Sequence, residues 1–183
     1  MRNDIQDHWL IPAKRILSPN HNERPSGGRI DLLVIHNISL PPGKFGGPYI
    51  PDFFTNQLDR TVHPYFEEIA ALEVSAHLLI RRNGRVIQFV PFNKRAWHAG
   101  DSCFQDEQGC NDFSIGIELE GSDDVKFTAQ QYRQLADVTK RLMTAYPGIT
   151  ADRIVGHSDI APGRKTDPGN AFDWDLFRQL LET

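Results

Sequence analysis

Three residues far apart in the chain, His36, His157 and Asp167, carry side chains that can hold a metal ion. Each stands at the end of an apolar, strand-like run or in the loop after one, a place where metal sites are often assembled. Two imidazoles and one carboxylate leave a tetrahedral zinc ion one open position for water, which is the composition of a catalytic zinc site. The pattern therefore predicts an enzyme with a zinc cofactor.

Two further residues are candidates for chemistry beside such an ion. Glu118 lies in an apolar run, where a carboxylate is costly unless it is paired or neutral. A buried salt bridge explains Glu118 about as well as catalysis does, but hydrolysis at zinc needs a base, which favours an acid/base role. Lys165 supplies a cation. Asp159 competes for either role, and its alternative is a turn or capping residue.

The segment 156–169 combines His157, Asp159, Lys165 and Asp167 with several Pro and Gly residues. Such a loop can hold side chains at fixed angles without helical or sheet pairing. Its spacing is nevertheless far less diagnostic than two His on one helix. With seven His in the chain, an isolated His such as His36 is more often structural than a ligand.

Three strand-like runs must position these residues. The runs 29–38, 113–119 and 153–156 lead to or contain His36, Glu118 and His157. In the second run, Glu118 shares a face with Ser114 and Gly116 because side chains alternate along a strand. The Pro- and Gly-rich segment 39–51 is expected to be a long loop that forms a wall of the site.

Other elements follow from local signals. Asn83-Gly84 joins the apolar runs 74–80 and 85–90 and predicts a hairpin with a type I′ turn, which argues against an all-parallel sheet. Thr128 with Gln131 fits a capping box for a helix that ends near 146–148, and Asp173 caps a final amphipathic helix. Interleaved strands and helices around one sheet indicate an α/β or mixed α+β fold.

Length and composition limit the possible organisation. The 183 residues, 39% of them hydrophobic, predict a single domain over 1–183, with 1–28 as an irregular segment packed on it. A formal net charge of −4 argues against nucleic acid as a partner, and no basic run or roughly 20-residue apolar stretch points to a membrane. The N-terminus resembles no secretory signal, so we expect a cytoplasmic protein with Cys103 and Cys110 as free thiols. We also expect a monomer.

Five separated stretches, in the same order, resemble the zinc-dependent N-acetylmuramoyl-L-alanine amidases, a superfamily shared with phage amidases and peptidoglycan-recognition proteins. The resemblance is strongest to the cytoplasmic branch that acts on 1,6-anhydro-muramoyl peptides, and it runs nearly end to end. The stretches are VIHNISLPPG (34–43), VSAH (74–77), RAWHAG (95–100), NDFSIGIELEG (111–121) and 156–169.

The resemblance implies roles for individual residues. His36, His157 and Asp167 match the zinc ligands, Glu118 the acid/base, and Lys165 the residue that stabilises the oxyanion. The implied fold is a central mixed β-sheet flanked by helices, with zinc in an open groove. In phage relatives a tyrosine precedes the His of the hairpin strand; here that residue is Ala76, so we interpret His77 as structural.

The implied reaction is hydrolysis of the amide between the lactyl group of a 1,6-anhydro-N-acetylmuramoyl peptide and L-alanine. Such a reaction belongs to peptidoglycan recycling and influences β-lactamase induction. Candidate substrate contacts are Asn37, Trp97, His98 and Arg164. Core packing is the alternative for Trp97, and solvent exposure is the alternative for Arg164. Relatives grip the far end of the peptide with an arginine that is absent near Gly109 here.

Three other classes remain open at this level. An exported or phage-type autolysin acting on polymeric peptidoglycan would need an export signal. A non-catalytic peptidoglycan-recognition module would keep the groove and lose the metal ligands. A structural zinc protein would add a fourth protein ligand, for which His77, His98, Cys103 and Cys110 are the candidates.

Overall fold

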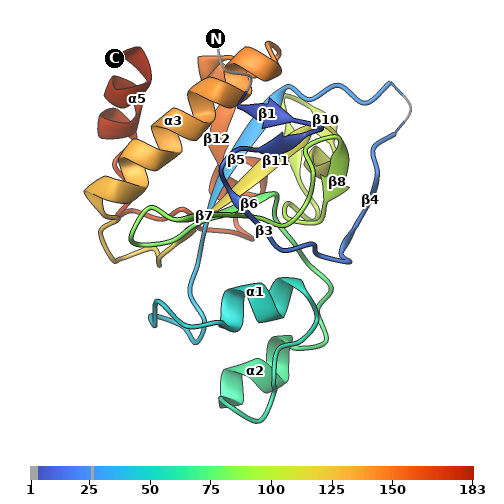
Figure 1. Cartoon of the computed structure of the whole chain (residues 1–183), viewed down its shortest axis with the longest axis vertical. Coiled ribbons are helices and arrows are strands. Elements are labelled where there is room, and N and C mark those ends of the chain that lie inside the picture. Colours follow the sequence, from blue (N-terminus) through green and yellow to red (C-terminus); the bar gives the residue numbers. More distant parts are fainter. Residues whose placement is uncertain (1–3, 26) are drawn as a thin grey trace.

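A six-stranded mixed sheet forms the centre of the computed structural model, which describes residues 4–25 and 27–183 (Figure 1). Its first four strands run parallel, β7 is antiparallel to β6, and the edge strand β3 is parallel to β7. The predicted mixed sheet flanked by helices is therefore confirmed. In spatial order the strands are β12 (Ile154–Gly156), β5 (Leu32–Ile38), β11 (Ser114–Glu120), β6 (Leu78–Ile80), β7 (Val86–Gln88) and β3 (Lys14–Arg15).

The two central strands, β5 and β11, are buried on both faces, which suits their Val- and Ile-rich sequences. On one face Leu33, Ile35 and Ile117 pack into the main core. On the other face lie Val34 and His36 of β5 and Ser114, Gly116 and Glu118 of β11, because side chains alternate along a strand. The polar candidates of these strands therefore share the face turned away from the main core.

Helices α3 (Ala129–Ala145) and α5 (Trp174–Glu182) cover the apolar face of the sheet and lie side by side (Figure 1). Both predicted N-caps are confirmed. Thr128 and Gln131 form a reciprocal capping box, and the Asp173 side chain accepts a hydrogen bond from the Leu176 N–H. These caps satisfy backbone donors that the first helical turn leaves free.

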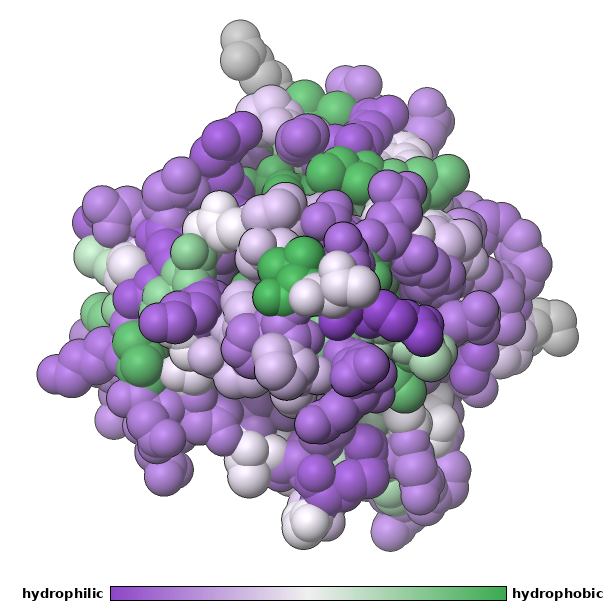
Figure 2. Space-filling view, turned by 90° about the horizontal axis from the view of Figure 1, so that it is seen from below, coloured by the Kyte–Doolittle hydropathy of each residue, from purple (hydrophilic) through white to green (hydrophobic). Residues whose placement is uncertain are grey.

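Helices α1 (Tyr49–Phe54) and α2 (Pro64–Ile69) form a lobe on the opposite side of the sheet (Figure 1). Phe53, Phe54 and Phe66 pack against Phe89 and Leu79 of the sheet region in a second apolar cluster. The expected loop 39–51 is thus shorter than predicted, because its last three residues open α1. Figure 2 shows that this side of the molecule is mainly hydrophilic, with apolar residues in small separate groups.

Two local predictions are corrected by the structure. The hairpin exists, but Gly84 has φ +80° while Asn83 is not at positive φ, so the turn is not type I′. The Gly84 N–H donates to the Arg81 carbonyl, as in a type I turn followed by a left-handed glycine.

The second correction concerns the N-terminal segment expected to be irregular. It contains β1 (Ile5–Gln6), paired with β2 (Trp9–Leu10), and β4 (His21–Glu23), paired with β8 (Lys94–Ala96). Its β3 even joins the central sheet. These strands are two or three residues long, too short to show an alternating pattern in sequence.

The remaining elements are small. A two-stranded pair, β9 (Cys103–Phe104) and β10 (Glu107–Gln108), projects before β11, and the short helix α4 (His157–Ile160) follows β12. Cys103 and Cys110 are free thiols, as expected. Within the described residues, no helix combines the length and apolar character that spanning a bilayer requires.

Candidate metal centre and groove

The candidate site is assembled at the carboxyl ends of three parallel strands. His36 lies near the end of β5, and His157 follows directly after β12. Glu118 of β11 is the register partner of His36 on the neighbouring strand. Ligands of open α/β sheets commonly bind at this edge, where parallel strands end together. The Asp159 carboxylate accepts a hydrogen bond from the Gly156 N–H, so Asp159 has the capping role considered as its alternative.

His36, His157 and Asp167 converge on one point. The Nδ1 atoms of the two histidines are 3.0 Å apart, and the Asp167 Oδ2 lies 2.9 Å from His36 Nδ1 and 3.0 Å from His157 Nδ1. Both imidazoles are almost fully buried. Among the described residues, these three are the group of His, Cys, Asp and Glu side chains placed to share a metal ion.

We call His36, His157 and Asp167 the trio. The contacts around them indicate that the three atoms that face one another, the two Nδ1 atoms and Asp167 Oδ2, bear lone pairs. His157 Nε2 is 3.0 Å from the Ala99 carbonyl oxygen, an acceptor, so Nε2 carries a proton. When the ring acts as a neutral metal ligand, His157 Nδ1 therefore presents its lone pair on the side of the Asp167 carboxylate. Two acceptors at this distance repel each other unless a cation lies between them. Two imidazole nitrogens and one carboxylate oxygen are a donor set that zinc accepts, so the three residues present fit this ion.

The electrostatics of His36 and Asp167 favour the protonation states that bind a metal. Burial lowers the pKa of His36 to about 4, so its imidazole is neutral at pH 7. Burial raises the pKa of Asp167, but the close contact of its carboxylate with the His157 and His36 rings outweighs burial and holds that pKa well below its ordinary value. Neutral imidazoles and an ionised carboxylate are the ligand forms that metal binding requires.

Glu118 stands beside the trio without a partner of its own. Its side chain is 9% exposed, and its buried Oε2 has no hydrogen-bond partner among the described residues. Burial, followed by the nearby Asp167 charge, raises the pKa of Glu118 well above its ordinary value, while Lys165 opposes the shift. The salt-bridge alternative is not what the structure shows: Glu118 makes no ion pair in the described part of the chain.

A cavity of about 380 Å³ connects these groups. Its polar lining includes the trio, Glu118 and Lys165. Its apolar lining comes from α1, α2 and the segments that flank these helices. The loop 39–51, which was expected to form a wall of the site, contributes Ser39, Leu40 and Pro42 to the lining. The sequence did not predict the part formed by α1 and α2, because neither short helix carries a clear periodic pattern; Pro64 at the first helical position was the available signal. The apolar residues are Leu40, Pro42, Phe53, Phe54, Tyr65, Ile69, Leu72 and Val74.

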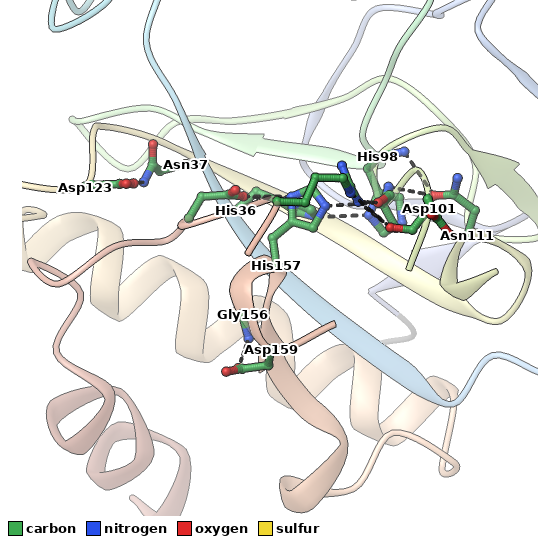
Figure 3. Close-up of polar contacts among 12 residues, drawn as sticks. His36, Asn37, His98, Asp101, Asn111, Asp123, Gly156, His157 and Asp159 are labelled. Atoms are coloured by element: carbon green, nitrogen blue, oxygen red, sulfur yellow. Dashed lines mark hydrogen bonds and ion pairs between the residues drawn. The ribbon is translucent and has the colours of Figure 1, made fainter. Parts of the chain in front are cut away.

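Trp97 and Asn37 both line the cavity, but each already uses a polar group. The Trp97 indole N–H donates to the Asn22 side chain at 3.2 Å, which fixes the ring at the cavity wall. The Asn37 amide donates to the Asp123 carboxylate at 2.7 Å, on the side of His36 opposite His98 (Figure 3). Its amide nitrogen is thus held by the protein, and its carbonyl oxygen is the group that remains for a substrate.

Of the two other expected substrate contacts, His98 also lines the cavity, whereas Arg164 is not among its lining residues. His98 Nδ1 lies 2.9 Å from His36 Nε2 (Figure 3). The His98 ring therefore contacts His36 through the nitrogen that does not face His157 and Asp167. The Arg164 guanidinium donates to the backbone carbonyls of Ala99 and Asp101. Ala99 is the same carbonyl that receives His157 Nε2–H. Sequence separation of more than 60 residues hid both arrangements.

His77 has the structural role that was expected for it. Its Nδ1 accepts the Gly116 N–H at 3.1 Å, and its Nε2 lies 3.1 Å from the Lys94 carbonyl oxygen. These two bonds satisfy the neutral ring and link β11 to β8. His77 and both cysteines lie outside the trio, so the described residues provide no fourth protein ligand of the kind that a structural zinc site needs.

Fold, trio and groove together define a hydrolase of the amidase type. The family model for N-acetylmuramoyl-L-alanine amidases matches residues 26–170, and the chain belongs to that family. It is an N-acetylmuramoyl-L-alanine amidase by this membership.

The most similar of the relatives that we compared belong to one kind of N-acetylmuramoyl-L-alanine amidase. The chain is 58% identical to the 1,6-anhydro-N-acetylmuramyl-L-alanine amidase AmpD of Salmonella typhimurium strain SL1344, over 94% of this chain and 92% of that protein. It is 57% identical to AmpD of Escherichia coli K12, with coverage of 97% and 96%. A crystal structure of a selenomethionine derivative of AmpD superposes with a TM-score of 0.94, at 56% identity and coverage of 97% and 98%.

A more distant amidase has been seen with a substrate. The structure of AmiD from E. coli, in complex with anhydro-N-acetylmuramic acid-L-Ala-D-γ-Glu-L-Lys, matches with a TM-score of 0.60 at 33% identity. The match covers 83% of this chain and 57% of that one.

Proposed function

We propose that this protein hydrolyses the amide bond between the lactyl group and L-alanine in 1,6-anhydro-N-acetylmuramoyl peptides, with zinc held by His36, His157 and Asp167. The observation that carries the proposal is the convergence of three lone-pair atoms within 3.0 Å, beside a buried carboxylate that has no other partner. The names of the relatives at 56–58% identity support the anhydro-sugar substrate.

Glu118 and Lys165 have different roles in the proposed reaction, which follow from their charge and burial. A zinc ion held at this site supplies Lewis acidity, which acidifies water and polarises a carbonyl. Glu118, whose buried carboxylate has no hydrogen-bond partner among the described residues, accepts the proton of the attacking water and later delivers it to the amine of the departing L-alanyl peptide. The Lys165 ammonium stabilises the negative charge that builds on the carbonyl oxygen, a contribution of about 10²–10³ in rate for a well-placed donor.

The groove suits a molecule with a polar reacting centre and a less polar body. The amide lies at the polar lining of the cavity, and the apolar lining and the Trp97 ring face the sugar or peptide beside it. The domain 1–183 acts as a single unit in this proposal. We place the reaction in the cytoplasm, in peptidoglycan recycling, where removal of anhydro-muropeptides also lowers the signal for β-lactamase induction.

The test is a substrate comparison with metal analysis. Purified protein is expected to contain one zinc per chain and to release L-alanyl peptide from anhydro-muramoyl tripeptide, measured by liquid chromatography and mass spectrometry. Chelation should abolish release and added zinc should restore it. Matched reactions contain reduced, non-anhydro muropeptide and intact sacculi. Equal turnover of sacculi would contradict the recycling role and favour an autolysin, and absence of zinc would contradict the mechanism.

A further inference from the structure

His98 lies between a member of the metal-binding trio and a buried serine. Its Nδ1 is 2.9 Å from His36 Nε2, and its Nε2 is 3.1 Å from Ser114 Oγ. The rings of His36 and His98 meet edge to face, with centroids 5.0 Å apart and an interplanar angle of 85°. Ser114 is fully buried. The three side chains form a line that starts at the metal site and ends inside the protein.

The direction of each hydrogen bond in this line follows from the first. His36 Nδ1 faces His157 and Asp167, so a neutral His36 that offers this lone pair to a metal carries its proton on Nε2. That N–H donates to His98 Nδ1. The proton of His98 then resides on Nε2 and is donated to Ser114 Oγ. The chain of hydrogen bonds from His36 through His98 to Ser114 therefore fixes the tautomer of both imidazole rings, with the proton on Nε2 in each.

The His98 ring packs directly against the backbone of Gly116. A Cβ placed on Gly116 would lie 2.5 Å from both Cγ and Nδ1 of His98, closer than real contacts allow. Gly116 stands between Ser114 and Glu118 on the face of β11 that points to the site. The ring is therefore held at both nitrogens and packed against bare backbone, which leaves it little freedom to turn.

We propose that His98 is a positioning residue, which fixes the orientation and tautomer of His36 for zinc, and that Ser114 and Gly116 hold His98 in place. This proposal rests on the proposed function and deepens it. Hydrogen-bond partners behind a metal-binding histidine orient the ring and raise its basicity, and their loss typically costs 10–100-fold in metal affinity or activity. His98 thus acts through His36, and this role is separate from the substrate contact expected for His98, which also lines the cavity.

Two substitutions at position 98 separate hydrogen bonding from packing. His98→Phe keeps a ring but removes the acceptor, so zinc affinity should fall about 10–100-fold. His98→Asn can place an amide oxygen near the former Nδ1 position and should recover most of the affinity. Affinity is measured by competition with a chromophoric chelator at pH 7, on protein shown to be folded by circular dichroism. His8→Asn, at an exposed histidine in the N-terminal segment, is the control and should bind zinc like wild type.

Two further substitutions test the support of the His98 ring. Gly116→Ala leaves every polar group in place but pushes the ring, and should weaken zinc binding. Ser114→Ala should change the tautomer balance of His98, which nitrogen-15 spectra of the imidazoles report directly. In wild type these spectra should show His36 and His98 both protonated on Nε2 when zinc is bound.

The outcomes distinguish the two proposals. Wild-type protein that fails to bind zinc would overturn the proposed function and this inference with it. If wild type binds zinc and folded His98→Phe binds it within twofold as tightly, only the positioning role is overturned. Equal losses for the Phe and Asn variants would also overturn it, since packing alone would then explain the effect.

Discussion

Glu118 and His36 are register partners on adjacent parallel strands, so their side chains leave the sheet at the same level and on the same face. This pairing places a carboxylate next to an imidazole of the candidate metal centre, although 82 positions separate them in sequence. The strands β5 and β11 are buried along most of their length, which restricts movement of both side chains. A general base near a metal site needs this kind of fixed approach.

Replacement of Glu118 by Gln should abolish most turnover while leaving zinc bound. Gln keeps the shape but cannot accept a proton from water, and loss of general base catalysis typically costs 10²–10⁴ in rate. The measurement is kcat on anhydro-muramoyl tripeptide, with zinc content determined on the same sample. Glu67→Gln, on the exposed surface of α2, is the matched control. Near-normal turnover in Glu118→Gln would assign the base elsewhere.

Replacement of Lys165 by Ala should lower kcat more than it raises KM. Charge on the carbonyl oxygen develops in the transition state, so an ammonium that stabilises it contributes there, with a loss of about 10²–10³ in kcat. Lys126→Ala is the control, because Lys126 is an exposed lysine outside the cavity. A change confined to KM in Lys165→Ala would indicate ground-state binding.

Replacement of Asp167 by Asn should weaken zinc binding strongly. The amide retains the shape of the carboxylate but loses the charge that balances the cation at the trio. The loss should exceed the 10–100-fold range expected when a partner behind a ligand is removed. Chelator competition measures it, and Asp101→Asn serves as the control at an exposed carboxylate in the nearby loop. Unchanged affinity would exclude Asp167 from the metal site.

Stability of the metal-free protein should fall as the pH decreases from about 6.5 to 4. Burial lowers the pKa of His36 to about 4, and it lowers the pKa values of His77 and His98 well below their ordinary value. In the unfolded chain these histidines titrate near pH 6.5 and bind protons that the folded state does not. The unfolded state therefore gains protons as the pH drops, and the free energy of unfolding decreases.

Urea unfolding at several pH values in a chelator measures this dependence. His98→Phe removes one of the three buried titrating groups, so its stability should vary less steeply over the same range. A free energy of unfolding that stays constant between pH 6.5 and 4 would contradict the burial of neutral histidines.

Much of the local structure is determined by the sequence alone. The strands around His36 and Glu118, the hairpin at Gly84, and the helices begun by Thr128 and Asp173 all depend on patterns within a few residues. Hydrophobic alternation, turn residues and caps act over that range, so they can be interpreted without knowing the fold. The residue types of the trio likewise indicated a metal site before its geometry was known.

Tertiary structure decided which distant groups meet. The parallel register of β5 and β11, the placement of His98 behind His36, and the bond from Arg164 to the Ala99 carbonyl join segments separated by more than 60 residues. No local propensity encodes such pairings, because they result from how the whole sheet packs. The same holds for the apolar lining of the cavity, since α1 and α2 are short helices that gain their stability by burying Phe53, Phe54 and Phe66 against the sheet.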